Sequence, residues 1–356
     1  MKETPTLKQI AQELGLSIGT VQRALHNKGG YSEETQKRIL DAAARCGYTA
    51  NPAASALRRA PINLAAVFPA PEGVNRYFFN QVWQGIDKAC SELSLYHLSV
   101  ARYYAEPDSL QAVDIAESLL QSDPPIDGLI TNEINDPRFN SLIETFAQRK
   151  IPVFLVNAAK ENSTGRYYAS ANQHAGKLAA DILSIACSEK KGKILLLGGS
   201  HTNIRQATLV KDFFQQMNLT CPDISILTIH SFEKPFELKK LIRESCDALP
   251  DVIGLYAVSA RETLSMCQAL QTYKPPHRLI TVGTDAFPEL IPFFQDGTLT
   301  ASVYQYPAQQ SFTAVKTLVG HVLQTEFHSE PLLFPIAAVF QSNADVFCHT
   351  PVLIRG

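Results

Sequence analysis

From Ile62 onward, short apolar runs alternate with amphipathic helical patterns. The apolar runs include INLAAVF (62–68), PVFLVN (152–157) and VIGLYAV (252–258). The helical patterns between such runs lie near residues 79–93, 109–121 and 139–149. Strands that are apolar on both faces are typical of parallel sheets, whose neighbouring strands need a crossover between them. The alternation therefore predicts an α/β body in which helices cover both faces of the sheet.

The strands of this body fall into two series. The first series has runs at 62–68, 96–103, 127–132 and 152–157. The second begins at YYASAN (167–172) and has further runs at 193–199, 225–230, 252–258 and 279–285. Two series predict two lobes, the first of about 62–160 plus 290–325 and the second of about 161–289 plus 326–345. Because ligands of doubly wound sheets bind beyond the carboxyl ends of the strands, the polar residues that close each strand are candidate ligand contacts.

The first 60 residues have a different pattern. LKQIAQEL (7–14) places its apolar residues on one helix face, with Thr6 able to cap the helix and Gly15 able to end it. Ser17 can cap a second helix after a connection of about three residues, and a third helical pattern follows at 33–46. Two short helices with such a tight connection have helix-turn-helix geometry, which also occurs in helical domains that do not bind DNA.

Charge is distributed unevenly along the chain. Residues 1–60 contain nine Lys or Arg and five Asp or Glu, a net charge of +4, whereas the whole chain has a net charge of −2 and the remaining 296 residues therefore carry −6. A basic head on an acidic body favours a phosphate-binding module joined to a part that does not contact DNA.

Composition indicates a soluble globular protein, with 45% hydrophobic and 19% charged residues. No run of about 18 apolar residues and no signal-peptide pattern occurs, so we expect a cytoplasmic protein that does not contact a membrane. The seven cysteines are scattered without a CxxC spacing, which favours reduced thiols over disulfides or a zinc site.

Two segments of the head carry a specific resemblance. TLKQIAQELGLSIGTVQRAL (6–25) and SEETQKRILDAAARCGYTANPAASAL (32–57) resemble the DNA-binding head and hinge of the LacI/GalR family of bacterial transcription regulators. The most diagnostic residues are Thr20, Val21, Arg23, Gly47, Tyr48, Asn51 and the hinge residues 54–57. The resemblance implies a helix-turn-helix DNA-binding domain at 1–49, a hinge helix and linker at 50–61, and an effector-binding and dimerisation domain at 62–356. The expected fold class is α/β: a small all-α head plus a two-lobed, doubly wound parallel-sheet body like that of periplasmic binding proteins.

The resemblance places the second helix in the major groove of DNA. Ile18, Gly19 and Arg23 match base-facing positions of the family, and an arginine can pair with O6 and N7 of guanine. Ile18 offers only apolar contact, for example to a thymine methyl group, and has the alternative of a core position beside Val21. Gln22 suits either a base contact or a phosphate contact.

Further DNA contacts follow from the same resemblance. Contacts to phosphates are implied for side chains and backbone N–H groups near the helix starts and in the following loop, namely Thr6, Ser17, Thr20, Asn27 and Lys28. The hinge includes Ala54 and Leu57. Leu57 matches a leucine that inserts into the minor groove and kinks the operator, and its alternative is a linker residue that packs on the body.

The resemblance also implies a small-molecule effector between the lobes. The matching positions are Tyr77, Phe78 and Phe79, which correspond to an aromatic site for a sugar ring, and Asn157, Arg205, Ser259, Asp285, Tyr304 and Gln305. Asp285 and Gln305 together suit vicinal hydroxyl groups, which favours a sugar or a polyol. Ser259 and Asp285 have the alternative of capping the helices that follow them.

Two departures from sugar-binding relatives leave the effector class open. Ala158 stands where many relatives have arginine, and Arg205 is several residues out of register with the arginine expected after GGS (198–200). A nucleobase or a sugar phosphate is therefore an alternative effector.

No catalytic pattern appears in the chain. The sequence has no G-x-G-x-x-G, G-x-S-x-G or HExxH pattern and no nucleophile with a paired base, so we expect neither an enzyme nor a cofactor or metal site. A solute-binding transport protein is disfavoured by the attached head and the missing export signal. The prediction is a regulator, expected to act as a repressor, that binds a palindromic DNA operator as a homodimer. The C-terminal PVLIRG lacks the leucine heptads of a tetramer-forming coil.

Overall fold

The computed structural model describes residues 6–25, 29–46, 60–106, 110–159, 167–171, 174–188, 190–199, 203–229, 237–273, 275–324, 332–349 and 353. The chain divides into two compact units, residues 1–60 and residues 61–356. All seven cysteines are free thiols, as their spacing predicted. Within the described ranges no helix combines the length and the apolar character needed to cross a bilayer.

In the described residues of the head there are three helices, α1 (Leu7–Leu14), α2 (Ile18–Leu25) and α3 (Glu33–Cys46). Thr6 and Gln9 form a capping box at the start of α1, and Gly15 ends this helix in the left-handed region at φ 66°. The three helices pack on a small shared core of Ile10, Ala11, Val21, Ala24, Ile39, Ala42 and Ala43. The apolar residues that the sequence places on one face of each helix therefore form the core of the head.

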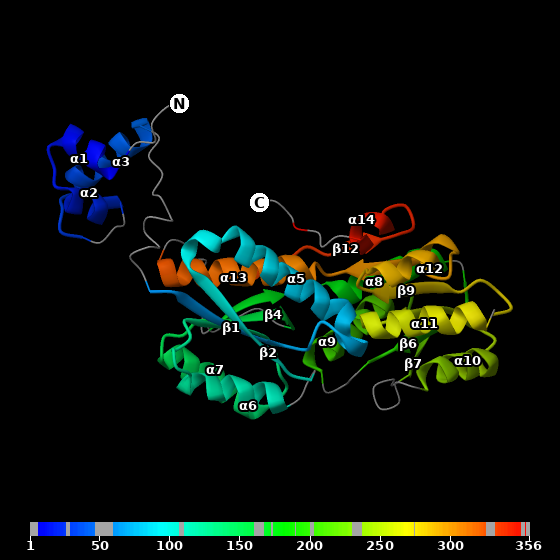
Figure 1. Ribbon diagram of the computed structural model, residues 1–356. Helices are drawn as coiled ribbons and strands as arrows, with labels where there is room; N and C mark the ends of the chain where they lie inside the picture. The colour runs from blue at the N-terminus through cyan, green and yellow to red at the C-terminus, as the bar shows by residue number, and fades with distance from the viewer. Residues whose placement is uncertain are drawn as a thin grey trace. The chain divides into compact units, whose positions relative to one another are not determined.

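The first lobe of the body is built on a six-stranded parallel sheet. Its strands are β1 (Ile62–Phe68), β2 (Leu98–Tyr104), β3 (Gly128–Asn132), β4 (Val153–Ala158), β5 (Tyr168–Ala171) and β11 (Leu332–Leu333), in the order β11-β5-β4-β3-β1-β2. Helices α5 (Arg76–Glu92) and α13 (Pro307–Leu323) lie side by side on one face, and α6 (Leu110–Ser118) and α7 (Pro137–Gln148) cover the other (Figure 1). Helices α5 and α13 approach so closely that a Cβ atom on Gly85 would lie 2.1 Å from the carbonyl oxygen of Ala308.

The second lobe repeats this arrangement on a second six-stranded sheet. Its strands are β6 (Lys193–Leu197), β7 (Ser225–Ile229), β8 (Val252–Ala257), β9 (Ile280–Thr284), β10 (Ala301–Tyr304) and β12 (Ala337–Val339), in the order β12-β10-β9-β8-β6-β7. The helices are α8 (Ala175–Cys187), α9 (Ile204–Thr220), α10 (Leu238–Ala248), α11 (Ala260–Thr272), α12 (Ile291–Gln295) and α14 (Ala344–His349). Helices α8 and α9 pack on one face, whereas α10 and α11 pack on the other. Strand β12 runs antiparallel to β10, and the other pairs are parallel.

The division of the chain between the lobes differs from the predicted one. Strand β5 belongs to the first sheet, because Phe154 and Leu155 pair with Tyr168 and Ala169. Strand β11 also joins the first sheet, and β10 joins the second through its pairing with β9. The sequence pattern identifies a buried strand but not the strand with which it pairs. The predicted boundaries between the lobes at residues 160, 290 and 325 were therefore wrong. By its described elements, the body therefore crosses between the lobes three times: after β5, between β10 and α13, and between β11 and β12.

Candidate functional site

Helix α2 of the head presents an exposed face. Ser17 caps the helix, since its Oγ accepts a hydrogen bond from the backbone N–H of Thr20 at 3.0 Å. Gly19 and Gln22 are exposed, and Ile18 has 47% of its surface exposed while Val21 is buried. The core alternative for Ile18 is therefore wrong, and its side chain is free to make an apolar contact.

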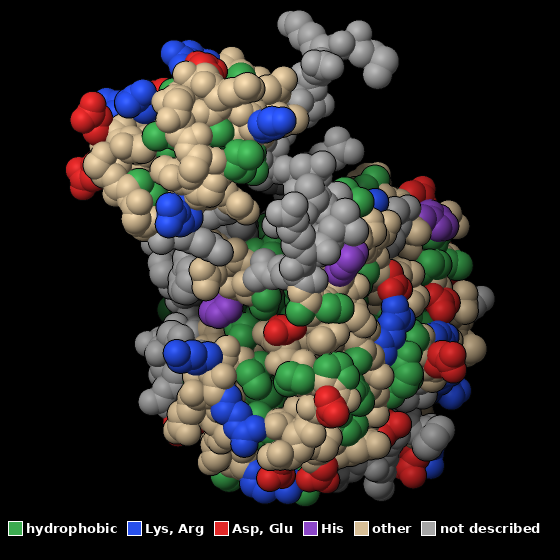
Figure 2. All heavy atoms as spheres, turned by 60° about the vertical axis from the view of Figure 1, so that its left-hand side comes forward, with side chains coloured by type: hydrophobic (Ala, Val, Ile, Leu, Met, Phe, Trp, Pro, Cys, Tyr) green, Lys and Arg blue, Asp and Glu red, His purple; other side chains and the backbone are tan. Residues whose placement is uncertain are grey.

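Arg23 is also exposed, and its guanidinium lies beside Gly30, at the turn that precedes α3. Figure 2 shows that Lys, Arg, Asp and Glu side chains are mixed on the visible faces of both the head and the body. Four residues predicted to contact DNA, Asn27, Lys28, Ala54 and Leu57, lie outside the described residues, as does the hinge.

The body contains a cavity of about 310 Å³ beyond the carboxyl ends of strands from both sheets. The first lobe contributes Phe68, Asn75, Tyr77, Phe78, Phe79, Glu106, Asn132, Glu133, Val156 and Asn157. The second lobe contributes Asn203, Arg205, Gln206, Leu209, Val258, Ser259, Ala260, Arg261 and Asp285, and Gln305 lies on the crossover between β10 and α13. The cavity thus combines aromatic surface with many amide groups and a few charges, a composition that suits a small polar ligand.

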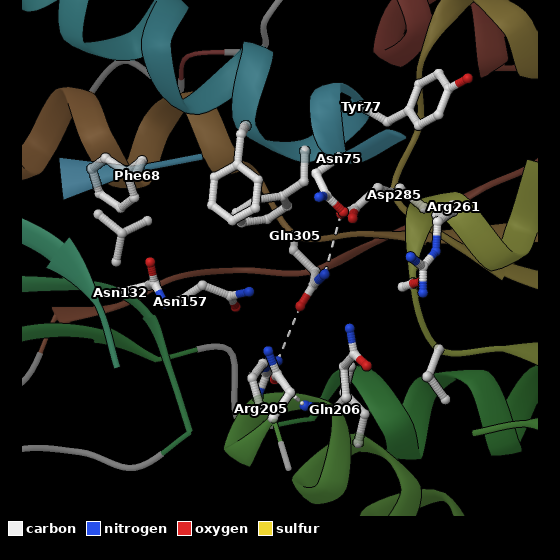
Figure 3. A pocket seen from close by; sticks show the side chains of 18 of the residues that line it. Phe68, Asn75, Tyr77, Asn132, Asn157, Arg205, Gln206, Arg261, Asp285 and Gln305 are labelled. Atoms are coloured by element: carbon white, nitrogen blue, oxygen red, sulfur yellow. Dashed lines mark hydrogen bonds between the residues drawn. The ribbon is translucent and has the colours of Figure 1, made fainter. Parts of the chain in front are cut away.

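Three of the predicted residues form a directed chain of hydrogen bonds at this cavity. Gln305 accepts from Nη2 of Arg205 at 3.1 Å and donates through Nε2 to Oδ1 of Asp285 at 3.1 Å (Figure 3). All three side chains are buried. Since an amide has one donor end and one acceptor end, these partners fix its orientation. Arg205 reaches the cavity from the first turn of α9.

Burial shifts the pKa values of Asp285 and Arg205, the two residues at the ends of this series of hydrogen bonds. Burial raises the pKa of the Asp285 carboxyl group to about 7, and the nearby Gln305 and Arg205 lower it only in part. Burial lowers the pKa of the Arg205 guanidinium to about 10. The charge of Asp285 is therefore sensitive to its surroundings near neutral pH.

Asp285 directly follows β9, and its backbone conformation differs from that of the strand. Asp285 has φ 67°, in the left-handed region that Asp and Asn enter more readily than most residues, and its N–H donates to the carbonyl of Val303 at 2.8 Å. Its carboxylate accepts from Gln305 rather than capping a following helix, which argues against the capping alternative for this residue.

The predicted aromatic residues all line the cavity. Tyr77 stacks on Phe287 of the second lobe, with ring centroids 4.2 Å apart, and is almost fully buried. Phe78 and Phe79 are partly buried and pack against the core between α5 and the first sheet. Arg76 lies over the ring of Tyr77. The Tyr77 ring therefore contacts both lobes as well as the cavity.

Ser259 and Asn157 each have a structural role as well as a place in the cavity wall. Ser259 caps α11 by accepting from the N–H of Glu262 at 3.3 Å and donates to the Glu262 carboxylate at 2.9 Å. The capping alternative for Ser259 therefore holds. Asn157 itself lies in the left-handed region at φ 53°, and its backbone N–H donates to the side chain of Gln310 at 2.8 Å.

Tyr304 does not line the cavity, in contrast to its predicted role. Its hydroxyl donates to Oε1 of Gln81 at 2.6 Å, and its ring packs against Tyr306 and Phe347. The reason is that successive side chains of an extended segment point to opposite sides, so Tyr304 and Gln305 cannot both face the cavity.

Comparison with known proteins identifies the parts of the chain. Residues 6–51 match the family of bacterial regulatory proteins of the lacI type, and residues 66–326 match the periplasmic binding protein domain family. The chain belongs to the LacI family of bacterial regulatory proteins. The predicted fold class and family are therefore confirmed, and because the family is not enzymatic, so is the prediction that the chain is not an enzyme.

Two relatives illustrate how this LacI-family chain matches other regulators. The transcriptional regulator DegA of Bacillus subtilis is 24% identical over 156 residues, which cover 44% of each chain. The transcriptional regulator GntR of Pseudomonas aeruginosa is 43% identical over 63 residues, 18% of each chain. The matched regions thus span less than half the length of these relatives.

Solved structures match the body of the LacI-family protein. A solute-binding protein of an Agrobacterium vitis ABC transporter, with bound D-fucose, gives a TM-score of 0.69 at 20% identity and covers 80% of this chain and 97% of its own. A solute-binding protein from Burkholderia graminis, in complex with D-arabinose, gives a TM-score of 0.71 at 18% identity, with coverage of 82% and 99%. At these identities the similarity concerns the fold alone.

Sequence reasoning missed several residues that line the cavity of this LacI-family body. Asn132 and Glu133 lie at the carboxyl end of β3. They could have been predicted, because ligands of doubly wound sheets bind beyond the carboxyl ends of the strands. Glu133 accepts a hydrogen bond from the N–H of Ala159 at 3.0 Å. Arg261 and Gln206 enter from the first turns of α11 and α9, and no pattern distinguishes them from ordinary helix residues.

The buried carboxyl of Asp285 predicts a pH dependence of stability. Its pKa of about 7 in the folded chain exceeds the ordinary value of 3.8, so the folded state holds this proton more tightly than the unfolded state. The resulting stabilisation is complete below the ordinary pKa and is lost as pH rises through about 7. Urea denaturation between about pH 5 and about pH 8 should show that the wild type loses stability relative to Asp285→Asn as pH rises. A constant difference between the two proteins over this range would contradict the shifted pKa.

Proposed function

We propose that this chain is a sequence-specific transcriptional repressor whose affinity for DNA is controlled by a sugar or polyol bound in the cavity between the lobes. The observation that carries the proposal is the buried chain of Arg205, Gln305 and Asp285 at that cavity. It offers a cation, an amide and a carboxyl group side by side, which together suit the donors and acceptors of adjacent hydroxyl groups.

The DNA-binding half of the proposal is supported by the head. Helix α2 exposes Ile18, Gly19, Gln22 and Arg23 along one side, while its other side packs into the core of the head. A helix that is exposed at its N-terminal turns can enter the major groove, with Arg23 reading a base. Contacts from Thr6, Ser17, Thr20, Asn27 and Lys28 to phosphates, and insertion of Leu57 next to Ala54 in the minor groove, complete the proposed interface.

A neutral polyhydroxylated effector is supported by the wall of the cavity. Aromatic side chains at Tyr77, Phe78 and Phe79 provide apolar surface for the face of a sugar ring, and amide side chains surround it. The similar solute-binding proteins from A. vitis and B. graminis contain D-fucose and D-arabinose. The two arginines at the cavity, Arg205 and Arg261, favour a sugar phosphate as the alternative effector.

The regulatory step is proposed to be a change in the relative position of the lobes. Two bodies pair in a homodimer, so that two heads reach the two halves of a palindromic operator in the cytoplasm. An effector that contacts both lobes biases their arrangement and thereby the separation of the two hinges. Coupling of this kind changes operator affinity by about 5-fold to 150-fold, or about 1 to 3 kcal/mol.

The experiment that tests the proposal measures thermal unfolding of the whole chain with a panel of compounds. The panel contains D-fucose, D-arabinose, myo-inositol, sugar phosphates and nucleobases. A compound at 100 times its Kd stabilises the folded chain by about 2.7 kcal/mol. Operator sequences are selected in parallel from a random duplex library. Saturation by a sugar that also changes operator binding supports the proposal, saturation only by phosphorylated or nucleobase compounds supports the alternative, and failure to select any DNA sequence contradicts the regulatory role.

A further inference from the structure

Two buried glutamines of the first lobe contact the segments that present Asp285 and Gln305. Gln81 lies on α5 and Gln310 lies on α13, the two helices that pack side by side on the first sheet (Figure 1). Neither glutamine lines the cavity. Both are nevertheless buried, with 8% and 0% of their surface exposed. Burial of a primary amide is costly unless its donors and acceptors are satisfied, so the partners of these two side chains define their role.

Gln310 joins the crossover segment to the end of β4. Its Nε2 donates to the carbonyl oxygen of Gln305 at 2.7 Å, and its Oε1 accepts from the backbone N–H of Asn157 at 2.8 Å. Both contacts lie at bends, because Asn157 has φ 53° and Tyr306, which follows Gln305, has φ 55°.

Gln81 makes an equivalent pair of contacts on the other side of Asp285. Its Nε2 donates to the carbonyl oxygen of Ala286 at 2.7 Å, and its Oε1 accepts from the hydroxyl of Tyr304 at 2.6 Å. Ala286 directly follows Asp285, and Tyr304 directly precedes Gln305. Gln81 therefore contacts the chain neighbours of Asp285 and Gln305 from a helix of the first lobe. Gln310 contacts the backbone of Asn157 and Gln305 from the helix that follows the crossover.

We propose that Gln81 and Gln310 form an inter-lobe clasp that positions Asp285, Gln305 and Asn157 for effector binding. The clasp rests on the proposed function, since these three residues are its proposed effector contacts. The hydrogen bonds connect the carboxyl ends of β4 and β9 with the β10–α13 crossover, so a ligand that moves any one of these segments acts on the other two. Gln81 and Gln310 are positioning residues and do not touch the ligand.

The clasp is tested in the full chain with Gln310→Met, which keeps the length of the side chain but removes its donor and acceptor. The matched control is Gln309→Met on the same helix, because Gln309 is partly exposed and its Nε2 donates to Thr313. Amide hydrogen exchange read by mass spectrometry should become faster in peptides that contain Asn157 and in those that contain Gln305 and Tyr306. The control should leave both segments unchanged, whereas a general loss of packing would accelerate exchange throughout α13.

Effector affinity provides the second measurement, with D-fucose, the first compound of the panel, as the probe. If the wild type binds D-fucose, Gln310→Met should weaken binding by at least about tenfold, and Gln309→Met should not. If the wild type does not bind D-fucose, the sugar proposal is weakened, but the exchange measurement still decides whether the clasp exists. Unchanged exchange at both segments in Gln310→Met overturns the clasp whatever the probe does.

Gln310→Glu separates the two halves of the clasp and replaces Gln310→Met if that variant fails to fold. A carboxylate can still accept from the N–H of Asn157 but cannot donate to the carbonyl of Gln305. Exchange should therefore stay slow around Asn157 and become faster around Gln305 and Tyr306. Unchanged exchange around Gln305 and Tyr306 in Gln310→Glu would show that Gln310 only fills space, and would overturn its positioning role.

Discussion

Asp285→Asn is expected to weaken effector binding by about 10-fold to 100-fold and to leave operator binding in the absence of effector unchanged. The substitution preserves the size of the side chain, and asparagine also tolerates the φ of 67° at this position. Above about pH 7, where the carboxyl group of Asp285 is ionised, the substitution removes a charged acceptor, and a hydrogen bond to a charged group contributes about 1.5 to 3 kcal/mol. The side chain belongs to the body, whereas the proposed DNA contacts belong to the head, which forms a separate compact unit.

The measurement for Asp285→Asn is a thermal titration with the panel compound that saturates the wild type, followed by an operator titration with and without it. Asp223→Asn serves as the matched control, since Asp223 is an exposed carboxylate of the same lobe that does not line the cavity. Full retention of the effector response in Asp285→Asn would place the effector site elsewhere in the body.

Arg23→Ala is expected to weaken operator binding through the loss of one base contact in each half-site. A bidentate arginine–guanine pair contributes about 1 to 3 kcal/mol of discrimination, so a dimer with two such contacts loses about 2 to 6 kcal/mol. Affinity for random DNA should fall much less, because nonspecific binding depends on phosphate contacts. Arg23 is exposed on α2 and is not needed for the core of the head, so the variant should keep the fold.

Fluorescence anisotropy with operators that carry single base-pair changes measures this effect. Arg45→Ala is the control, because Arg45 is an exposed arginine of α3 that pairs with Glu13 at 2.9 Å and lies outside the exposed face of α2. If Arg23 reads a base, the variant becomes indifferent to the base pair at one position per half-site. A uniform loss on all sequences, with a smaller salt dependence, would instead assign Arg23 to a phosphate.

Local pattern was sufficient to predict the head and most elements of the body. The helices of the head follow from apolar spacing and from caps at Thr6, Gly15 and Ser17, which act within a few residues of their own position. The strands of the body appear as apolar runs because each is buried on both faces. Strand-end positions also located Asp285, since parallel strands bring their carboxyl ends to one edge.

Pairing and side-chain direction needed the tertiary structure. Strands β5 and β10 were assigned to the wrong lobes because a strand's partner depends on contacts with residues far away in the chain. Tyr304 points away from the cavity while Gln305 points into it, and a shift of one residue in the predicted register exchanges the two.

The sequence by itself determined that a helix-turn-helix head precedes a two-lobed α/β body, because apolar periodicity and capping are local properties. Only the tertiary structure decided that Arg205 joins Gln305 and Asp285 in one buried chain, and that Gln81 and Gln310 bind beside them. These residues come from α9, the crossover, the end of β9 and the two helices, α5 and α13, that cover one face of the first sheet. Their meeting depends on how the lobes pack, and packing joins residues whose separation in the chain leaves no periodic pattern.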